Sequence, residues 1–229
     1  MWRRLGLDRS EKTDTQLQDE SRKKIEDMID RGILRTPQLV RAFSRVSRHE
    51  FVPGEYRDRS YREISIPLPA LEGTISRPSS YAVFYEALEL GEGDRFLEIG
   101  TGSGYGVALA REAVGRGGRV VSIEIDRSAL AFARSNLSRL GYQDVILIRG
   151  DGALGYQPEA PYDKISVTAA IPSVPQGLLD QLGDDGLLIA PIGPIHEQVL
   201  KLIRSDGSAE TISKSASFVP MVGMYGSGR

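Results

Sequence analysis

From residue 79 to the C-terminus, apolar segments of two different periods alternate along the chain. Short apolar runs typical of strands are separated by longer segments whose apolar positions recur at helical spacing. The runs at 96–99 and 120–123 lack polar alternation, as expected of strands that are buried on both faces. This alternation predicts an α/β fold with a mostly parallel, doubly wound sheet that helices cover on both faces. Strands are predicted at 95–99, 119–125, 144–149, 164–168, 186–191, 198–204 and 216–224, and helices at 79–90, 104–114, 128–140 and 176–182.

The N-terminal part of the chain follows a different pattern. Scattered apolar residues among many charges predict a solvated amphipathic helix at 16–33. A second helix is predicted at 37–46, with Thr36 as its cap and a proline in its first position. Residues 47–78 are rich in proline and glycine but also hold aromatic residues and isoleucines, so we expect an ordered loop that lies on the core.

Composition narrows the class of protein. The 229 residues are 40% hydrophobic and 26% charged, which is typical of a globular protein with one substantial core. The formal net charge of −2 lacks the basic footprint of a nucleic-acid binder, so we expect no nucleic-acid partner. The chain has no cysteine and no run near the roughly 20 apolar residues of a membrane span. We therefore expect a cytoplasmic protein without a membrane partner, and we also expect a monomer.

A glycine-rich turn lies between a predicted buried strand and a predicted helix. Residues 96–105 are Phe-Leu-Glu-Ile-Gly-Thr-Gly-Ser-Gly-Tyr. Glycine permits positive φ and close backbone approach, so this turn can press its amides against a ligand that a Cβ would push away. Twenty residues after Gly104, at the end of the next strand, Glu124 can accept hydrogen bonds from both hydroxyls of a ribose. Together these features predict a nucleoside site, although isolated glycines would equally suit a tight turn between a strand and a helix.

The G-x-G-x-G spacing, with Glu98 before it and an acidic residue on the next strand, resembles the first motif of class I methyltransferases more than a dinucleotide fingerprint. The resemblance implies a Rossmann-like fold and S-adenosylmethionine as the cofactor. This cofactor has no pyrophosphate, and its amino-acid end and sulfonium suit carboxylates and carbonyls better than a phosphate cradle. The cofactor-binding residues expected on this basis are Glu98, Gly100, Thr101, Gly102, Ser103, Gly104, Tyr105, Glu124, Asp151 and Gly152.

Two acidic residues of this set have alternatives. Asp151 follows a predicted strand at the place where this fold usually has an acceptor for the exocyclic amine of adenine, but Gly-Asp-Gly is also an ordinary turn that ends a strand. Asp126 competes with Glu124 for the ribose. We expect Asp126 instead to cap the helix that begins at Ser128, which leaves the ribose to Glu124.

Several further motifs occur in order over roughly residues 37–225. They are Phe-Ser-Arg-Val-Ser-Arg-His-Glu-Phe-Val-Pro at 43–53, Thr-Ile-Ser-Arg-Pro at 74–78, Gly-Asp-Gly at 150–152, Ala-Pro-Tyr-Asp-Lys-Ile at 160–165 and Thr-Ala-Ala at 168–170. With the glycine turn, they resemble the protein-L-isoaspartate (D-aspartate) O-methyltransferases. The resemblance implies an enzyme that repairs damaged proteins by methylating the α-carboxylate of L-isoaspartyl residues, and that also acts on D-aspartyl residues. The ester then collapses to a succinimide without enzymatic help.

The resemblance also implies site residues. Ser76 matches a serine that lies by the transferring methyl and donates a hydrogen bond to the substrate carboxylate, which makes it the expected catalytic residue; the alternative is a serine that only caps the turn before Pro78. Because an ionised carboxylate is already a nucleophile, catalysis requires alignment rather than a general base. We divide the chain into a helical appendage with an active-site loop, 1–78, and a cofactor-binding catalytic domain, 79–229, in one compact unit. Substrate-side positions are Thr74, Ile75, Thr168, Ala169 and Ala170.

The loop around Ser76 departs from the family pattern. Gly-Gln usually precedes the threonine and His-Met often follows the proline, whereas this chain has Glu72-Gly73 and Ser79-Ser80. These changes motivate one alternative, a methyltransferase of the same lineage that acts on another carboxylate. A second alternative is a non-catalytic cofactor-binding module, against which the intact Ser76, Glu124 and Asp151 argue. Arg77 is interpreted as a solvated arginine, although it could pair with a substrate carboxylate. Neither His49 nor His196 has a second ligand at metal spacing, so no metal site is predicted. Core or pocket-lining positions are predicted for Phe218, Met221 and Met224.

Overall fold

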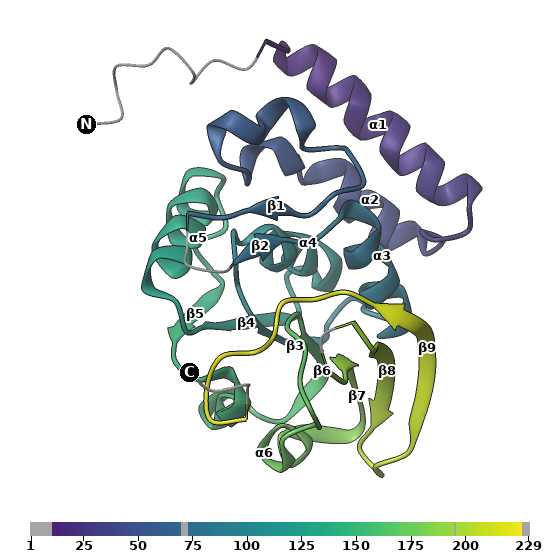
Figure 1. Cartoon of the computed structure of the whole chain (residues 1–229), viewed down its shortest axis with the longest axis vertical. Helices are drawn as coiled ribbons and strands as arrows, with labels where there is room; N and C mark the ends of the chain where they lie inside the picture. The colour runs from purple at the N-terminus through teal and green to yellow at the C-terminus, as the bar shows by residue number, and fades with distance from the viewer. Residues whose placement is uncertain (1–10, 70–72, 195, 226–229) are drawn as a thin grey trace.

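The computed structural model describes residues 11–69, 73–194 and 196–225, and its centre is a seven-stranded sheet. The strands are β3 (Arg95–Ile99), β4 (Arg119–Glu124), β5 (Ile146–Arg149), β6 (Tyr162–Val167), β7 (Leu182–Ile192), β8 (Gln198–Arg204) and β9 (Ala209–Ala216). Their order across the sheet is β5-β4-β3-β6-β7-β8-β9 (Figure 1). The first five pair in parallel, and β8 and β9 complete the sheet in antiparallel pairs. The predicted α/β fold with a mostly parallel sheet is confirmed.

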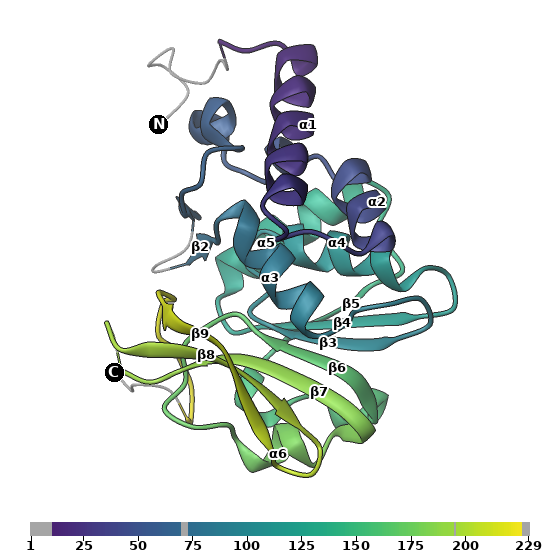
Figure 2. The same cartoon turned by 90° about the vertical axis from the view of Figure 1, so that its right-hand side faces the viewer.

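Helices cover the two faces of the sheet unequally. The helices α3 (Pro78–Ala87), α4 (Tyr105–Val114) and α5 (Arg127–Arg139) lie on one face, and the short helix α6 (Gln176–Leu179) lies on the other (Figure 2). Alternate side chains of a strand enter two different core clusters. Phe96 joins the cluster that includes residues of α3 and α4, whereas Leu97 joins the cluster that includes Leu178 of α6. Strand β3 is apolar without alternation because both of its faces are buried.

The sheet has a topological switch beside β3. This strand pairs with β4 on one side and with β6 on the other. The chain builds the sheet outward from β3 through β4 and β5, and then returns to build it in the opposite direction through β6 and β7. Such a switch opens a crevice outside the carboxyl ends of parallel strands, where ligands bind in open α/β sheets. The glycine turn of residues 100–104 lies at this end of β3.

The N-terminal residues form a second layer of helices above α3 and α4. This layer contains α1 (Asp14–Asp30), α2 (Pro37–Arg45), 3-10 turns at Arg48–Glu50 and Gly54–Arg59, and the antiparallel pair β1 (Ile66–Pro67) and β2 (Thr74–Ile75). A capping box between Thr13 and Gln16 begins α1. Met28 of α1 and Phe43 of α2 belong to the same hydrophobic cluster as Phe96 of β3, so the appendage and the sheet share one core.

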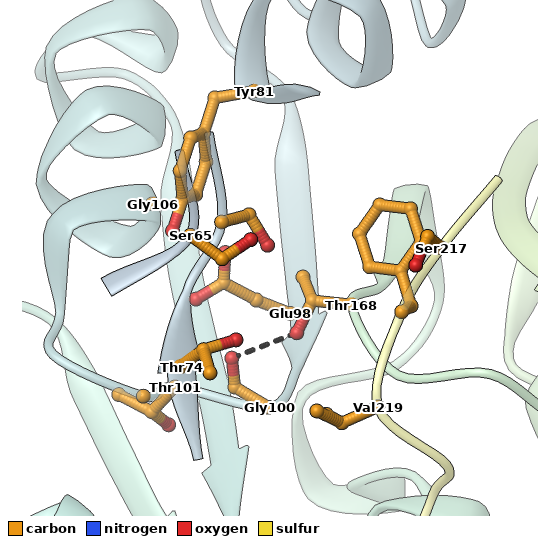
Figure 3. A pocket seen from close by; sticks show the side chains of 13 residues that line it. Ser65, Thr74, Tyr81, Glu98, Gly100, Thr101, Gly106, Thr168, Ser217 and Val219 are labelled. Atoms are coloured by element: carbon orange, nitrogen blue, oxygen red, sulfur yellow. Dashed lines mark hydrogen bonds between the residues drawn. The ribbon is translucent and has the colours of Figure 1, made fainter. Parts of the chain in front are cut away.

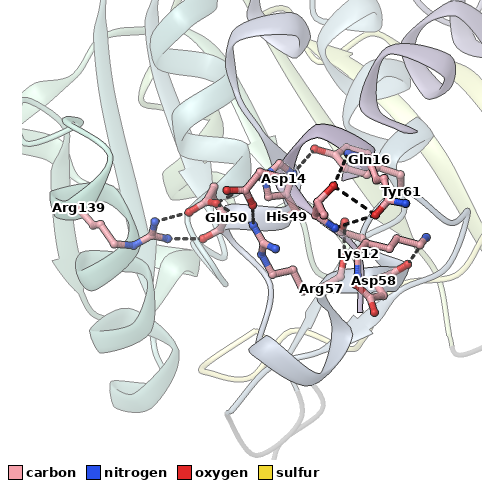
Figure 4. Close-up of polar contacts among 11 residues, drawn as sticks. Lys12, Asp14, Gln16, His49, Glu50, Arg57, Asp58, Tyr61 and Arg139 are labelled. Carbon is pink, nitrogen blue, oxygen red and sulfur yellow. Dashed lines mark hydrogen bonds and ion pairs between the residues drawn. The ribbon is translucent and has the colours of Figure 1, made fainter. Parts of the chain in front are cut away.

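Charged side chains also connect this layer to the rest of the molecule (Figure 4). Arg57 forms an ion pair with Asp14 of α1, and a second Arg57 contact reaches Glu50 at 3.5 Å. Arg139, at the end of α5, pairs with the Glu50 carboxylate and donates to its carbonyl oxygen at 2.6 Å. Glu50 therefore joins the appendage to the helix that packs behind the glycine turn.

Two local predictions were wrong. The last strand was expected at 216–224, but β9 is Ala209–Ala216. The residues of β9 are mostly polar and exposed because this is an edge strand, and the apolar residues that follow it leave the sheet to contact the carboxyl ends of other strands. Thr36 occupies the cap position of α2, but its hydroxyl donates to Glu86 Oε2 at 2.9 Å instead of capping the helix. The buried Glu86 carboxylate needs donors, and it also accepts the amides of Arg35 and Thr36.

Candidate active site

The turn between β3 and α4 requires its glycines. Gly100, Gly102 and Gly104 have φ values of +97°, +56° and +84°, a region that favours glycine. A Cβ on Gly100 would lie 2.4 Å from Thr168 Oγ1, and a Cβ on Gly104 would lie 3.0 Å from the Leu137 side chain. The Thr168 hydroxyl is 3.0 Å from the Gly100 carbonyl oxygen (Figure 3). The turn therefore has no room for a side chain at Gly100, beside the cavity-lining Thr168, or at Gly104, against α5.

Two adjoining cavities lie at this turn. The larger has a volume of about 370 Å³, and the smaller about 30 Å³. Both are lined by Thr74, Gly100, Gly102, Thr168 and Val219, which mark the boundary between them. A volume of this size with mostly apolar walls is typical of a small-molecule site. The larger cavity is lined further by Leu68, Gly73, Ile99, Ile123, Glu124, Ile125, Asp126, Ala129, Gly152, Ala169, Pro220, Met221 and Val222.

Glu124 closes one wall of the larger cavity. Its carboxylate accepts the Gly102 amide at 2.9 Å and the Asp126 amide at 3.0 Å, so both oxygens are held in place by backbone groups. The Asp126 carboxylate accepts the amides of Ser128 and Ala129, each at 2.8 Å, and thereby caps α5. The interpretation of Asp126 as a helix cap is confirmed, and the Glu124 carboxylate remains available to a ligand in the cavity.

Glu98 lies in the smaller cavity as a buried carboxyl group. Only 1% of the residue is exposed, and burial raises the pKa of Glu98 to about 8. The hydroxyl groups of Ser122 at 3.3 Å and Tyr85 at 3.4 Å partly oppose this shift. No ion pair involves Glu98 within the described ranges. A cation that binds beside Glu98 would lower this pKa and favour the ionised carboxylate.

The substrate-side positions divide into two groups. Ser76 and Thr74 line the smaller cavity, Thr168 lines both cavities and Ala169 lines the larger. The other two contribute through packing and backbone: Ile75 is buried in the core, and Ala170 exchanges backbone hydrogen bonds with Val219 and Met221 at 2.8 Å. These two bonds hold the 219–221 segment over the larger cavity.

The remaining predicted cofactor residues also differ in position. Thr101 lines the smaller cavity and Gly152 the larger, where a Cβ on Gly152 would lie 2.2 Å from Ile99. Ser103 and Tyr105 line neither cavity. The Ser103 carbonyl accepts Asn136 at 3.1 Å, and the Tyr105 ring packs in the core. These two residues contact α5 and the hydrophobic core instead of the cavities.

The Asp151 carboxylate already accepts hydrogen bonds from two backbone amides. These are the Ala153 amide at 2.9 Å and the Met224 amide at 2.7 Å, and Asp151 lines neither cavity. A contact with adenine thus stays a prediction that needs the Asp151 carboxylate to serve a further donor. The bond to Met224 instead fastens the C-terminal segment beside the larger cavity.

Several lining residues were not singled out from the sequence. Ser65, Tyr81 and Ser217 line the smaller cavity, and Leu68 and Val222 line the larger. Phe218 and Met221, predicted as core or pocket lining, line the smaller and the larger cavity respectively, whereas Met224 is 73% exposed. Ser65 and Leu68 belong to the proline-rich loop, where no periodic pattern indicates which side chains face inward.

The structure describes some of the positions around Ser76 at which this chain departs from the family pattern. Glu72 lies outside the described residues. Arg77 is exposed and its side chain pairs with no carboxylate in the described part of the chain, as expected of a solvated arginine. Ser79 donates its hydroxyl to Glu63, which places it at the start of α3 and away from the cavities.

The described residues hold no group of three or more acidic or histidine side chains arranged to bind a metal ion. His49 lies 2.8 Å from the Tyr61 hydroxyl through Nδ1 and 3.5 Å from Glu50 through Nε2, so both ring nitrogens have protein neighbours. Within the same residues, no helix combines the length and hydropathy needed to cross a membrane.

A mostly parallel sheet with a glycine turn at its switch point, and an acidic residue on the neighbouring strand, define an α/β protein of the class I methyltransferase type. The model of the protein-L-isoaspartate(D-aspartate) O-methyltransferase family matches residues 19–226, and the chain belongs to this family.

Relatives agree over most of the length. The chain is 42% identical to protein-L-isoaspartate O-methyltransferase 1 of Archaeoglobus fulgidus, with 91% of this chain and 96% of the relative covered. It is 43% identical to the protein-L-isoaspartate O-methyltransferase of Methanoculleus marisnigri, with the same coverage of 91% and 96%. Among solved structures, a protein-L-isoaspartate O-methyltransferase superposes with a TM-score of 0.78 at 31% identity over 87% of this chain and 65% of the other.

A second solved structure shares the fold. It is a protein of Plasmodium falciparum described as a protein-L-isoaspartate O-methyltransferase in complex with S-adenosyl-L-homocysteine, with a TM-score of 0.77 and 22% identity. The alignment covers 88% of this chain and 97% of that one.

Proposed function

We propose that this enzyme transfers the methyl group of S-adenosylmethionine to the α-carboxylate of L-isoaspartyl residues, and to the free side-chain carboxylate of D-aspartyl residues, in damaged proteins. The observation that carries the proposal is the position of Ser76. In this chain, which belongs to the family, Ser76 lines the smaller cavity, and this cavity adjoins the larger one at the glycine turn. A methyl acceptor bound at Ser76 therefore lies beside a ligand that fills the larger cavity.

The residues present fit S-adenosylmethionine, the cofactor of the family. The backbone of Gly100 and Gly102 approaches the cavities without a Cβ, and a side chain at Gly100 would collide with Thr168. The apolar wall formed by Ile99, Ile123 and Ile125 suits an adenine ring, and the fixed Glu124 carboxylate suits ribose hydroxyls. Glu98 suits the amino group of the methionine end. When bound, S-adenosylmethionine supplies an electrophilic methyl group on a sulfonium that is a good leaving group.

The protein's own contribution is placement and desolvation. Ser76 donates a hydrogen bond to one oxygen of the substrate carboxylate, and the other oxygen is left to attack. Thr74 and Thr168, at the boundary of the cavities, direct the carboxylate toward the larger cavity. Exclusion of water strengthens these interactions and frees the carboxylate from its hydration shell. No general base is needed because the substrate carboxylate is ionised at neutral pH.

The direct experiment measures transfer of labelled methyl from S-adenosylmethionine to an isoaspartyl peptide and to its normal-aspartyl twin. We expect labelling of the isoaspartyl peptide only. Equal labelling of both would favour a carboxylate methyltransferase of another specificity, and labelling of neither, with cofactor binding intact, would favour a non-catalytic module.

Ser76→Ala tests the assignment of the catalytic residue. The variant should reduce turnover on the isoaspartyl peptide by about 10- to 100-fold, the effect of one hydrogen bond to a charged group, and should leave cofactor affinity within about twofold. Ser79→Ala is the matched control, because Ser79 belongs to the same segment but bonds Glu63 outside the cavities. A loss of cofactor affinity in Ser76→Ala would mean that the serine serves the cofactor instead.

A further inference from the structure

Arg48 is a fully buried arginine whose charge is not compensated. Its exposed fraction is 0%, and its Nε donates to the Ser60 carbonyl at 2.7 Å. Neither Nη1 nor Nη2 has a hydrogen-bond partner among the described residues, and no ion pair to Arg48 exists within them. Burial lowers the pKa of Arg48, but a guanidinium stays charged in proteins. A buried charge without a partner is costly unless it serves an anion nearby.

Two tyrosines connect this guanidinium to the smaller cavity. The Arg48 guanidinium carbon lies 5.3 Å from the centre of the Tyr105 ring, which favours the cation through the ring face. Tyr105 in turn packs edge-on against Tyr81 with ring centres 5.0 Å apart. Tyr81 lines the smaller cavity together with Ser76 and Glu98. The unpaired positive charge thus stands directly behind one wall of the proposed substrate site.

The Tyr81 hydroxyl is arranged as a donor. The Ser76 backbone and the positive charge of Arg48 lower the pKa of the Tyr81 phenol, against the larger effect of burial. A guanidinium has no lone pair that accepts a hydrogen bond, so Arg48 cannot take the proton of the phenol, and the hydroxyl is left to donate into the cavity. Burial raises the pKa of Tyr81 to about 12, which keeps that proton in place at neutral pH. Figure 3 shows the hydroxyl end of the ring projecting into the cavity toward Ser65 and Glu98.

We propose that Tyr81 is a second catalytic residue, which donates its hydroxyl proton as a hydrogen bond to the substrate carboxylate beside Ser76, and that Arg48 is its positioning residue. The proposal rests on the proposed function, since it names the group that the substrate presents. Two donors on adjacent elements fix the plane of a carboxylate, whereas one donor fixes only a point. Arg48 supports the Tyr81 ring through the Tyr105 ring and supplies a positive charge that favours an anion in the cavity.

Tyr81→Phe tests the contact, because it removes the hydroxyl and leaves the ring. We expect kcat/KM on the isoaspartyl peptide to fall about 10- to 100-fold and the cofactor Kd to stay within about twofold. A second readout is the Kd of a fluorescent isoaspartyl peptide, measured with the protein saturated with S-adenosylhomocysteine so that no methyl is transferred. We expect the peptide to bind the variant more weakly. Tyr142→Phe is the control, since its hydroxyl bonds Glu112 away from both cavities.

The outcomes separate the two proposals. A wild-type protein that binds S-adenosylmethionine but labels no isoaspartyl peptide contradicts the proposed function and, with it, the role of Tyr81. An active wild type with an equally active Tyr81→Phe variant overturns the role of Tyr81 alone. A Tyr81→Phe variant that binds the cofactor more weakly while retaining peptide affinity shows that the hydroxyl serves the cofactor, which also overturns the proposal.

A double-mutant cycle tests Arg48. Arg48→Met keeps an unbranched apolar side chain in the buried space and removes the charge. We expect it to lower kcat/KM about 10-fold when Tyr81 is present and to have little further effect in the Tyr81→Phe background. A purely structural role would lower activity equally in both backgrounds, and that result would refute positioning through Tyr81. If the arginine variant is too unstable to assay, Tyr81→Phe and its peptide affinity still decide the main proposal.

Discussion

The buried carboxyl group of Glu98 predicts an unusual dependence of stability on pH in the cofactor-free protein. Its pKa is about 8 in the folded protein against an ordinary value of 4.5. Between these two pH values the unfolded chain has lost the proton and the folded protein still holds it. Stability therefore falls as pH rises through this window, at about 1.4 kcal/mol per pH unit. Over the whole window the loss amounts to roughly 5 kcal/mol, a large part of the stability of a typical domain.

Glu98→Gln removes this titration but preserves the shape of the side chain. The stability of the variant relative to wild type should rise by roughly 4 kcal/mol between pH 5 and pH 8. Urea unfolding of both cofactor-free proteins at half-unit steps of pH measures the difference, and groups that titrate alike in both proteins cancel. The neighbouring Glu124 charge, which raises the pKa of Glu98, is present in both. A stability difference that is constant over this range would refute the reasoning.

The same carboxyl group should couple to the cofactor. If the amino group of S-adenosylmethionine binds beside Glu98, binding at pH 7 must remove the proton, so cofactor affinity should increase as pH approaches 8. Calorimetry in buffers of different ionisation enthalpy measures the released proton. Glu98→Gln should bind more weakly and release fewer protons. Equal proton release by the two proteins would show that Glu98 does not contact the cation.

Two further predictions concern the glycine turn and its neighbour. Gly100→Ala places a Cβ 2.4 Å from Thr168 Oγ1 at a φ of +97°. We expect it to cost about 1 to 3 kcal/mol of stability in urea unfolding and to lower cofactor affinity at least about 10-fold in calorimetry. An alanine variant that binds normally would mean that the turn does not contact the cofactor. Asp126→Ala removes the cap of α5 and should cost about 1 kcal/mol in urea unfolding, and an unchanged midpoint would contradict the capping role.

The sheet and its glycine turn were predictable because local sequence determines them. Phe96 and Leu97 belong to a strand buried on both faces, which leaves no polar alternation. Gly100 and Gly104 have positive φ and closely packed surroundings, so their spacing is a physical requirement that a sequence displays. The helix cap at Asp126 is local in the same sense, since its acceptor and donors lie within three residues.

What could not be predicted depends on contacts between distant segments. The Asp151 carboxylate bonds the Met224 amide, 73 residues away, and nothing near Asp151 in the sequence indicates this partner. Strand β9 was misplaced because an edge strand can be polar, whereas the apolar residues after it contribute to the cavities. Arg48 lies within a motif of the family, yet its burial behind Tyr81 follows only from the stacking of the appendage on α3 and α4.

The separation of two buried ionisable groups, Glu98 in the smaller cavity and Arg48 behind its wall, follows from the two ligands that the proposed function requires. Glu98 raises the pKa of Tyr81 and Arg48 lowers it, so both groups lie near this tyrosine. They nevertheless form no ion pair with each other among the described residues. A direct pair would have satisfied both groups and left nothing for a ligand. With Tyr81 between them, the carboxyl group suits the ammonium of the cofactor and the guanidinium suits the carboxylate of the substrate. A site that must bring a cation and an anion together benefits from keeping its own acidic and basic groups apart, so that each stays free for a ligand.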